Sequence, residues 1–203
     1  MIDDPNVPDL LQPLLRAIAA QDDDLAESLV RQWTASAAPP LSDMLTWLDA
    51  RDADRRWWGV RALTAAAHVT GGGETLLEPL RQRLHDEDPA VRCASALALA
   101  ELGQQAATPD LVEALGDDSG WVRASAADAL ALLGEGAVPA LAAVLAGGQQ
   151  GARSRAAYAL SKIRTLATAN VFYHYLQDEN PLVQAYAYDT LDQMGFLQTV
   201  LVV

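Results

Sequence analysis

The stretch DEDPAVRCASALALAELG, at residues 86–103, constrains the fold most, because it recurs as DDSGWVRASAADALALLG at residues 117–134. Val91 in the first copy corresponds to Val122 in the second, so the copies are offset by 31 residues. A recurrence with a period of about 20–50 residues is typical of repeat proteins in which each unit buries its apolar side against its neighbours. The chain is therefore predicted to be a solenoid.

Each repeating unit has the pattern of two helices. Half of the residues are apolar (51%), and alanine and leucine, which favour helix, supply most of them. Apolar residues recur at helical spacing, and glycine and proline runs separate the segments. We predict one all-α solenoid over residues 1–203, made of about six antiparallel helix pairs at residues 9–37, 40–70, 74–103, 107–134, 136–165 and 167–195.

An apolar tail, FLQTVLVV at residues 196–203, follows the last predicted pair. A solenoid usually ends in a repeat with a polar outer face, so this tail needs a separate explanation. Three explanations stay open. The tail folds back on the final helix pair, it contacts a partner or a second copy of the chain, or it frays or marks a truncation.

The charge of the chain excludes one class of partner. The formal net charge is −13, from 27 acidic and 14 basic residues. A chain this acidic repels phosphate backbones, because nucleic-acid binding depends on Lys and Arg residues that neutralise phosphates. Nucleic acid is therefore not expected as a partner.

The sequence also favours a protein of the cytoplasm. The N-terminal residues, MIDDPNVPD, lack the apolar core of a signal peptide, and no apolar run approaches the ~20 residues of a membrane span. The single cysteine excludes an internal disulfide and fits a reducing compartment. We expect a soluble cytoplasmic protein that does not bind a membrane.

The unit D-x-x-x-x-V-R-x-x-x-A-x-A-L-x-x-L-G, which residues 86–103 and 117–134 match closely, resembles the HEAT-like repeats named after phycobilisome lyases. This resemblance implies a right-handed superhelix in which the second helix of each pair lines the concave side. Family members include bilin lyase subunits, which attach an open-chain tetrapyrrole to a cysteine of another protein. Many other members look like plain interaction modules. The segment WGVRAL, at residues 58–63, is similar to a stretch of the smaller lyase subunit.

Comparing the repeats with one another separates core positions from surface positions. Positions that keep the same residue type serve the packing that all repeats share, and they recur at helical spacing. Small alanines let neighbouring helices approach, and leucines fill the space between them. We assign five such columns to the core: Val91, Val122 and Val183; Ala96, Ala127 and Ala157; Ala98, Ala129 and Ala159; Leu99, Leu130, Leu160 and Leu191; and Leu102, Leu133, Ile163 and Met194.

Two columns change between repeats and lie four residues apart on one face of the second helices. One contains Cys93, Ala124, Ser154 and Ala185, and the other contains Leu97, Asp128, Tyr158 and Asp189. Positions that vary are free of the shared packing, so they are exposed or functional. Because the resemblance places the second helices on the concave side, we predict a binding strip there formed by Trp57, Arg61, Cys93, Leu97, Asp128, Tyr158 and Asp189.

An arginine stands at the start of several second helices: Arg56, Arg92, Arg123 and Arg153. We expect each to reach an aspartate in a neighbouring inter-helix loop and so to link one repeat to the next. The alternative is that this arginine column captures a carboxylate or phosphate of a ligand.

No catalytic or metal-binding motif is recognised. The three histidines, His68, His85 and His174, lie in different repeats and none precedes a glutamate. This differs from the HEAT-like di-iron hydroxylases, whose His-Glu pairs supply the metal ligands. Cys93 takes a small-residue position and is expected to be an inert thiol, with a nucleophile or bilin acceptor as the alternative. We predict no metal, no cofactor and no catalytic residue.

The most favoured function is a non-enzymatic module that binds a protein or peptide on its concave face, because a row of repeats offers a long shallow surface. The alternative, which the resemblance implies, is a bilin lyase or chaperone subunit working with a second HEAT-like subunit. Trp57 and the tyrosine-rich C-terminal third would then hold the pigment, and Arg61 would face a propionate. The tyrosines equally suit a protein interface or a larger terminal core.

Overall fold

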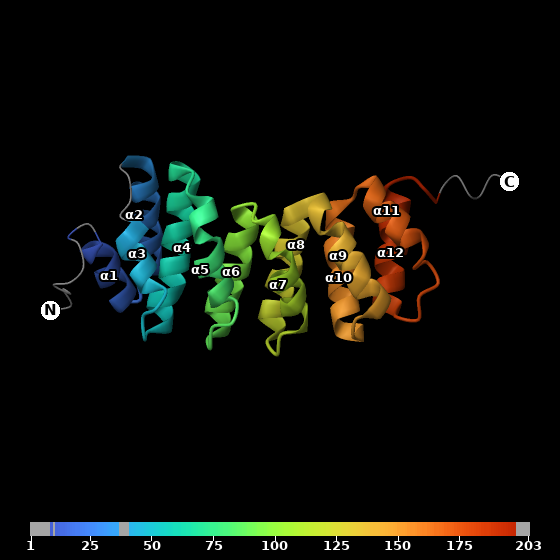
Figure 1. The fold of residues 1–203 in the computed structure, drawn as a ribbon, viewed down its shortest axis with the longest axis horizontal. Coiled ribbons are helices and arrows are strands. Elements are labelled where there is room, and N and C mark those ends of the chain that lie inside the picture. The colour runs from blue at the N-terminus through green and yellow to red at the C-terminus, as the bar shows by residue number, and fades with distance from the viewer. Residues whose placement is uncertain (1–8, 10, 37–40, 198–203) are drawn as a thin grey trace. The chain divides into compact units, whose positions relative to one another are not determined.

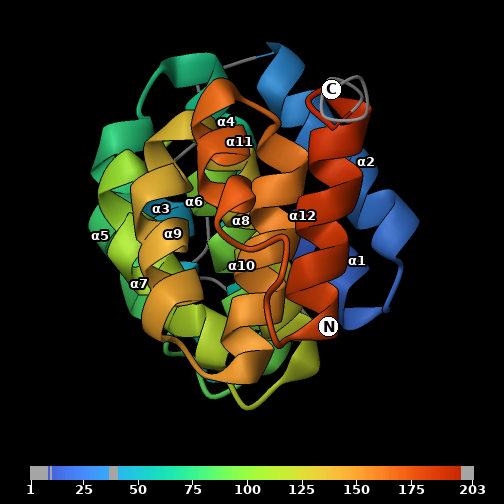
Figure 2. The same cartoon turned by 90° about the vertical axis from the view of Figure 1, so that its right-hand side faces the viewer.

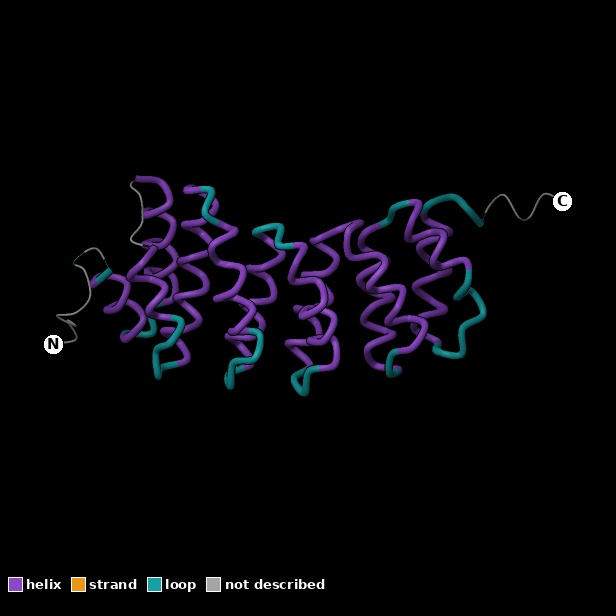
Figure 3. The backbone as a smooth tube through the Cα atoms, viewed as in Figure 1, coloured by secondary structure: helices purple, strands orange, loops and turns teal. Residues whose placement is uncertain are grey.

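The structure is a computed structural model that describes residues 9, 11–36 and 41–197. These residues form helices joined by short loops, and none of them lies in a strand (Figure 3). The predicted all-α solenoid is therefore confirmed. The chain divides into two compact units, residues 1–98 and 99–203, with the boundary inside one helix, and each unit is described by itself.

The first unit is built of helices packed pairwise (Figure 1). It contains α1 (Gln12–Ala19), α2 (Asp23–Ser36), α3 (Leu41–Trp47), α4 (Ala53–Thr70), η1 (Gly73–Leu76), α5 (Leu77–Arg83) and most of α6 (Pro89–Glu101). Helix α1 packs on α2, and α3 packs on α4. Helix α4 also packs on α2, so the second helices of consecutive pairs are neighbours.

The second unit repeats this arrangement in two layers (Figure 2). It contains η2 (Gln105–Ala107), α7 (Thr108–Glu113), η3 (Ala114–Gly116), α8 (Gly120–Leu133), η4 (Gly134–Ala137), α9 (Val138–Gly147), α10 (Gln150–Ile163), α11 (Leu166–Tyr173) and α12 (Pro181–Gln193). Helix α10 packs between α8 and α12 in one layer, and α9 packs between α7 and α11 in the other. This places the variable columns of α8, α10 and α12 on neighbouring helices of one layer.

The columns assigned to the core are buried, with one exception. All the valines, alanines and leucines of the first four columns are at most 3% exposed. In the fifth column only Leu133 is buried, whereas Leu102, Ile163 and Met194 are half-buried. The fifth column stands at the last turn of each second helix, where the chain turns away and fewer neighbours cover the side chain.

Several second helices end at a residue in the left-handed backbone region. Gly103 (φ 67°) and Gly195 (φ 81°) follow their helices, and the residue after each donates back to a carbonyl five residues earlier, as in a Schellman motif. Gln21 (φ 55°) and Arg164 (φ 51°) adopt a similar φ without the freedom of glycine. Arg164 and Gly195 are 31 residues apart, the repeat period, so this position at the end of a second helix accepts both residue types.

Gly134 ends α8 at φ 73° and ψ −143°, a region that essentially only glycine adopts. We expect Gly134→Ala to lower the free energy of unfolding by about 1–3 kcal/mol, because the new Cβ strains the backbone although no atom lies within 4 Å of it. Gly151→Ala is the matched control. It also meets open space but lies in helix α10, where alanine is favoured by about 0.5–1 kcal/mol. Urea denaturation that finds the same sign for both variants would contradict the backbone explanation.

The stretch Gly120–Gly147 corrects the expectation that no segment is apolar enough to cross a membrane. Its mean hydropathy reaches 1.9, and it meets the length and composition of a span. In the fold, however, Gly134 interrupts it, so that α8 and α9 are separate helices that both pack on α10. The apolar side chains of a repeat core pass the same compositional test, so this finding alone is weak evidence for a membrane.

Of the apolar tail, only its first two residues lie within the described part of the chain. Phe196 donates its backbone N–H to the carbonyl of Leu191, and its ring packs against Tyr173 at a centroid distance of 6.2 Å. The first residue of the tail therefore contacts the last helix pair, and the course of the tail stays a prediction. Residues 198–203 lie outside the described residues.

Candidate functional site

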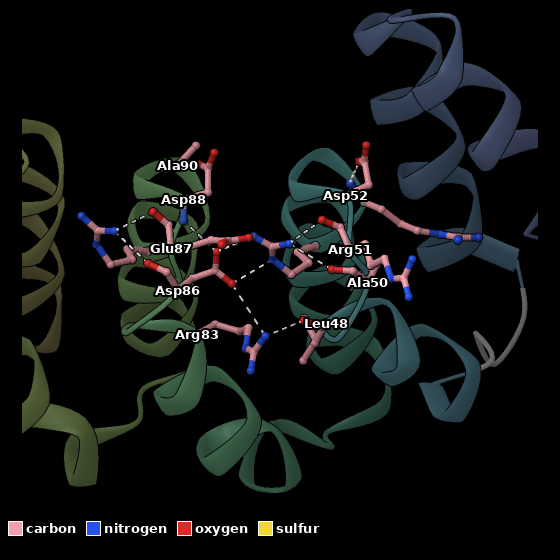
Figure 4. A network of polar contacts seen from close by, with 12 residues as sticks. Leu48, Ala50, Arg51, Asp52, Arg83, Asp86, Glu87, Asp88 and Ala90 are labelled. Atoms are coloured by element: carbon pink, nitrogen blue, oxygen red, sulfur yellow. Dashed lines mark hydrogen bonds and ion pairs between the residues drawn. The ribbon is translucent and has the colours of Figure 1, made fainter.

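The first arginine of the predicted column, Arg56, is a buried link between two loops of the first unit. Its Nε and Nη2 donate to the carboxylate of Asp86 at 2.9 and 2.7 Å, and Nη2 also reaches Glu87 at 3.1 Å. Nη1 donates to the carbonyls of Ala50 and Arg51 (Figure 4). These five bonds use all five donors of a guanidinium, so this arginine has none left for a ligand.

Asp86 is held from several sides in the same network (Figure 4). Its Oδ1 also accepts the backbone N–H of Asp88, and Nη1 of Arg83 lies 3.7 Å from its Oδ2. Burial alone raises the pKa of Asp86, but the hydrogen bonds from Arg56 and from the Asp88 N–H outweigh it and hold that pKa below its usual value. The carboxylate is therefore ionised at neutral pH and serves the fold.

The other arginines of the column also bind within the chain. Arg153 forms an ion pair with Asp178 in the following repeat, as predicted. Arg92 and Arg123 each donate to the carbonyls five and six residues before them, in the loop that precedes their own helix. Arg56 makes the same two backbone bonds. The column thus serves mainly to fix loops, which disfavours the alternative of ligand capture.

The predicted binding strip has four residues in the first unit. On α4, Trp57 is half-buried with its ring edge-on to Trp58 at 4.9 Å, and Arg61 forms an ion pair with Glu27 of α2 at 2.8 Å. On α6, Cys93 is half-buried and Leu97 is exposed. All four side chains reach solvent to some degree, which a binding role requires. That role itself stays a prediction.

Three residues of the strip lie in the second unit, and the structure brings two of them together. The Tyr158 hydroxyl donates to Oδ1 of Asp128 at 2.8 Å, and this bond, with partial burial, raises the pKa of Tyr158. Lys162 lies over the same ring at 5.2 Å, and Tyr186 packs on it edge-on at 6.0 Å. Asp189 is exposed on α12. This face therefore presents an aromatic ring between an acid and a base.

A cavity of about 320 Å³ lies at Trp57, where α1 ends and where α2, α4 and α6 begin. We call it the Trp57 pocket; it is lined by Ile18, Gln21, Asp23, Ala53, Asp54, Trp57, Trp58, Asp88 and Ala90. A second cavity of about 460 Å³ adjoins it and shares Ile18, Gln21 and Asp54. Periodicity pointed to Trp57 but not to the three aspartates, because acidic residues at helix starts are already explained by the helix dipole.

Three features of the described residues bear on metal binding and catalysis. No group of three or more His, Cys, Asp and Glu side chains there is placed to hold a metal ion. His68, His85 and His174 are each exposed and lie on separate elements. The Ser95 hydroxyl is buried without a hydrogen-bond partner, but its neighbours along α6 carry no base that would activate it.

Comparison with known proteins identifies the kind of fold. Residues 38–131 match the family model described as HEAT repeats. The Escherichia coli protein YibA is similar in structure, with a TM-score of 0.56 and 18% identity over 98% of this chain and 80% of that one. A search of curated proteins finds no match.

Two further solved structures are similar at a TM-score of 0.50. One is a designed armadillo repeat protein in complex with the peptide (KR)4, at 19% identity over 91% of this chain and 99% of that one. The other is human deoxyhypusine hydroxylase in complex with glycerol, at 21% identity over 93% of this chain and 73% of that one. At such identities the likeness shows the fold alone, a solenoid of the HEAT and armadillo kind.

Proposed function

We propose that this protein is a non-enzymatic interaction module that holds a protein or peptide on the face formed by the second helices of its repeats. The observation that carries the proposal is the contrast between columns on those helices. Ala98, Ala129 and Ala159 are buried, whereas the preceding residues Leu97 and Asp128 are exposed and differ in chemistry. The buried positions are thus shared by the repeats, whereas the exposed positions can differ from repeat to repeat and so suit a particular partner.

The second unit offers groups that suit a protein partner. Tyr158 presents an apolar ring and a polar tip, a combination that is enriched at protein interfaces. Asp128 and Lys162 on either side of it supply charges of both signs. Solenoid surfaces hold extended chains well, and one similar solved structure contains a designed repeat protein with a bound peptide.

The test is capture of partners from a lysate of the native host by immobilised protein. Tyr158→Ala and Leu97→Arg should each remove the captured partner, because they alter the second-helix face. Asn170→Ala and Gln82→Ala are exposed changes on first helices and should retain it. If all four variants retain the same partner, or all lose it, the second-helix face is not the binding surface.

The alternative function is a bilin lyase subunit that works with a second HEAT-like subunit. In that role Arg61 would face a propionate; its Nη2 forms an ion pair with Glu27 at 2.8 Å, and its side chain is 37% exposed. Mixing the protein with an equimolar bilin provides the check. A red-shifted, sharpened absorbance band would support the lyase role, and an unchanged spectrum would support the interaction module.

A further inference from the structure

We propose that the Trp57 pocket holds the cationic side chain, arginine or lysine, of a basic segment in the protein partner. This inference rests on the proposed function and specifies the partner's chemistry at one place. The pocket is defined by three aspartates and a tryptophan, together with small apolar residues, and all of them belong to the first unit.

The charge of the pocket favours a cation. Its lining contains Asp23, Asp54 and Asp88 and no Lys, Arg or His. Within the described part of the chain, the Asp23 and Asp54 carboxylates make no hydrogen bond or ion pair. Oδ1 of Asp88 accepts the backbone N–H of Ala90 at 2.7 Å. A hollow whose lining carries charge of one sign attracts a group of the opposite sign.

The basic residues nearest the pocket are not part of its lining. Arg61, one turn further along α4, is paired with Glu27. Arg55 lines the adjoining cavity, and its guanidinium carbon lies over the ring of Trp47 at 5.4 Å. The excess of acidic residues in the whole chain, 27 against 14, adds to the attraction at long range.

The side-chain caps of these helices are supplied by other residues. The start of α4 is already capped by Asp52, which accepts the N–H of Arg55 at 2.8 Å. The start of α2 is likewise capped by Asp22, which accepts the N–H of Leu25 at 3.0 Å. Asp23 and Asp54 stand one and two positions beyond these caps, so their carboxylates are available to a ligand.

The size and walls of the pocket favour an amino-acid side chain over a metal ion. The volume of about 320 Å³ exceeds that of a bare ion, and the described acidic side chains form no group close enough to chelate one. Ile18, Ala53 and Ala90 give apolar wall for the methylene stem of Lys or Arg. Trp57 gives the aromatic ring that binds cations best.

The test uses fluorescein-labelled octa-arginine, octalysine and octacitrulline in anisotropy titrations at ~0.1 M salt, where long-range attraction is largely screened. We expect wild-type protein to bind both cationic peptides and not octacitrulline. The planar guanidinium stacks on aromatic rings, so octa-arginine should bind more tightly than octalysine.

Variants separate the pocket from general acidity. Asp23→Asn with Asp54→Asn, and separately Trp57→Leu, should each weaken octa-arginine binding by about fivefold or more. Glu113→Gln with Glu135→Gln removes the same two charges from exposed positions and should change binding less than about twofold. Trp57→Phe keeps an aromatic ring, so its affinity for octa-arginine should lie between those of the wild type and Trp57→Leu. This graded result would distinguish the loss of the ring from a folding defect in the leucine variant.

The outcomes distinguish this inference from the proposed function. Three results would each overturn the proposal that the Trp57 pocket binds a cationic side chain. The wild type fails to bind octa-arginine, it binds octacitrulline equally well, or the control pair weakens binding as much as the pocket variants do. If the captured host partner still depends on the second-helix face in that case, the interaction module stands without the pocket. If the host partner is also insensitive to that face, both proposals fail.

Discussion

Replacing Asp86 with alanine is expected to lower the free energy of unfolding by about 3–5 kcal/mol, because it leaves the Arg56 guanidinium buried without its carboxylate. The side chains of this pair are only 5% and 3% exposed, and two hydrogen bonds join them. Urea denaturation followed by circular dichroism measures the change.

Two variants test that explanation. Glu87→Ala removes another carboxylate in contact with Arg56, but that side chain is 83% exposed, so its loss should cost at most about 1 kcal/mol. Changing Arg56→Met together with Asp86→Leu removes the buried charges altogether and should recover much of the stability. A double variant no more stable than Asp86→Ala would show that packing, rather than an unpaired charge, explains the loss.

The same pair makes stability depend on pH in a defined direction. The pKa of Asp86 is lowered in the folded protein, since its bonds from Arg56 and Asp88 outweigh the effect of burial. Its contribution is therefore complete above the unfolded pKa of about 3.9 and is lost as pH falls through the folded pKa. We expect the wild type to lose more stability than Asp86→Asn when denaturation is measured from pH 5 downward. Equal slopes would contradict the assignment.

Truncating Leu130 to alanine should cost about 2–5 kcal/mol, because the side chain is fully buried and the cavity it leaves can only partly collapse. Leu130 lies on α8, which packs on α7 and α10, so the loss affects both layers of the second unit. Urea denaturation again measures the effect. The loss should appear as a lower midpoint with little change in slope.

Leu132→Ala on the same helix is the matched control. That side chain is 59% exposed, so the same deletion of atoms should change stability by no more than about 0.5 kcal/mol. Comparable losses for the two variants would mean that the repeat columns do not separate core from surface. The expected contrast comes from burial alone, since residue type and helix are the same.

The repeated residues predicted the core closely. Val91, Val122 and Val183 are all buried, because hydrophobic spacing along a helix encodes which side faces its neighbours. The same comparison predicted that variable positions such as Leu97 and Asp128 reach solvent, and they do. It was less successful at the last helical turn, where Leu102 keeps its residue type but is only half-buried.

Comparison of the repeats did not predict which atoms the polar side chains contact. The equivalent arginines look alike in sequence, yet Arg56 and Arg153 bind carboxylates of the next repeat, whereas the bonds seen for Arg123 go to backbone carbonyls. One difference is visible in the sequence, because the loop after Arg123 that would supply the acid reads GGQQ. Which atoms meet still depends on loop geometry.

The sequence by itself determined helices, repeat period and core, because each follows from local spacing of apolar residues. Only the tertiary structure decided that Asp23, Asp54 and Asp88 meet at Trp57 around one hollow. These residues belong to three different repeats, and each has a sufficient local explanation at the start of its helix. The spacing of apolar residues shows which side of a helix is buried against its neighbours. Which helix ends lie next to one another depends on how the repeats stack.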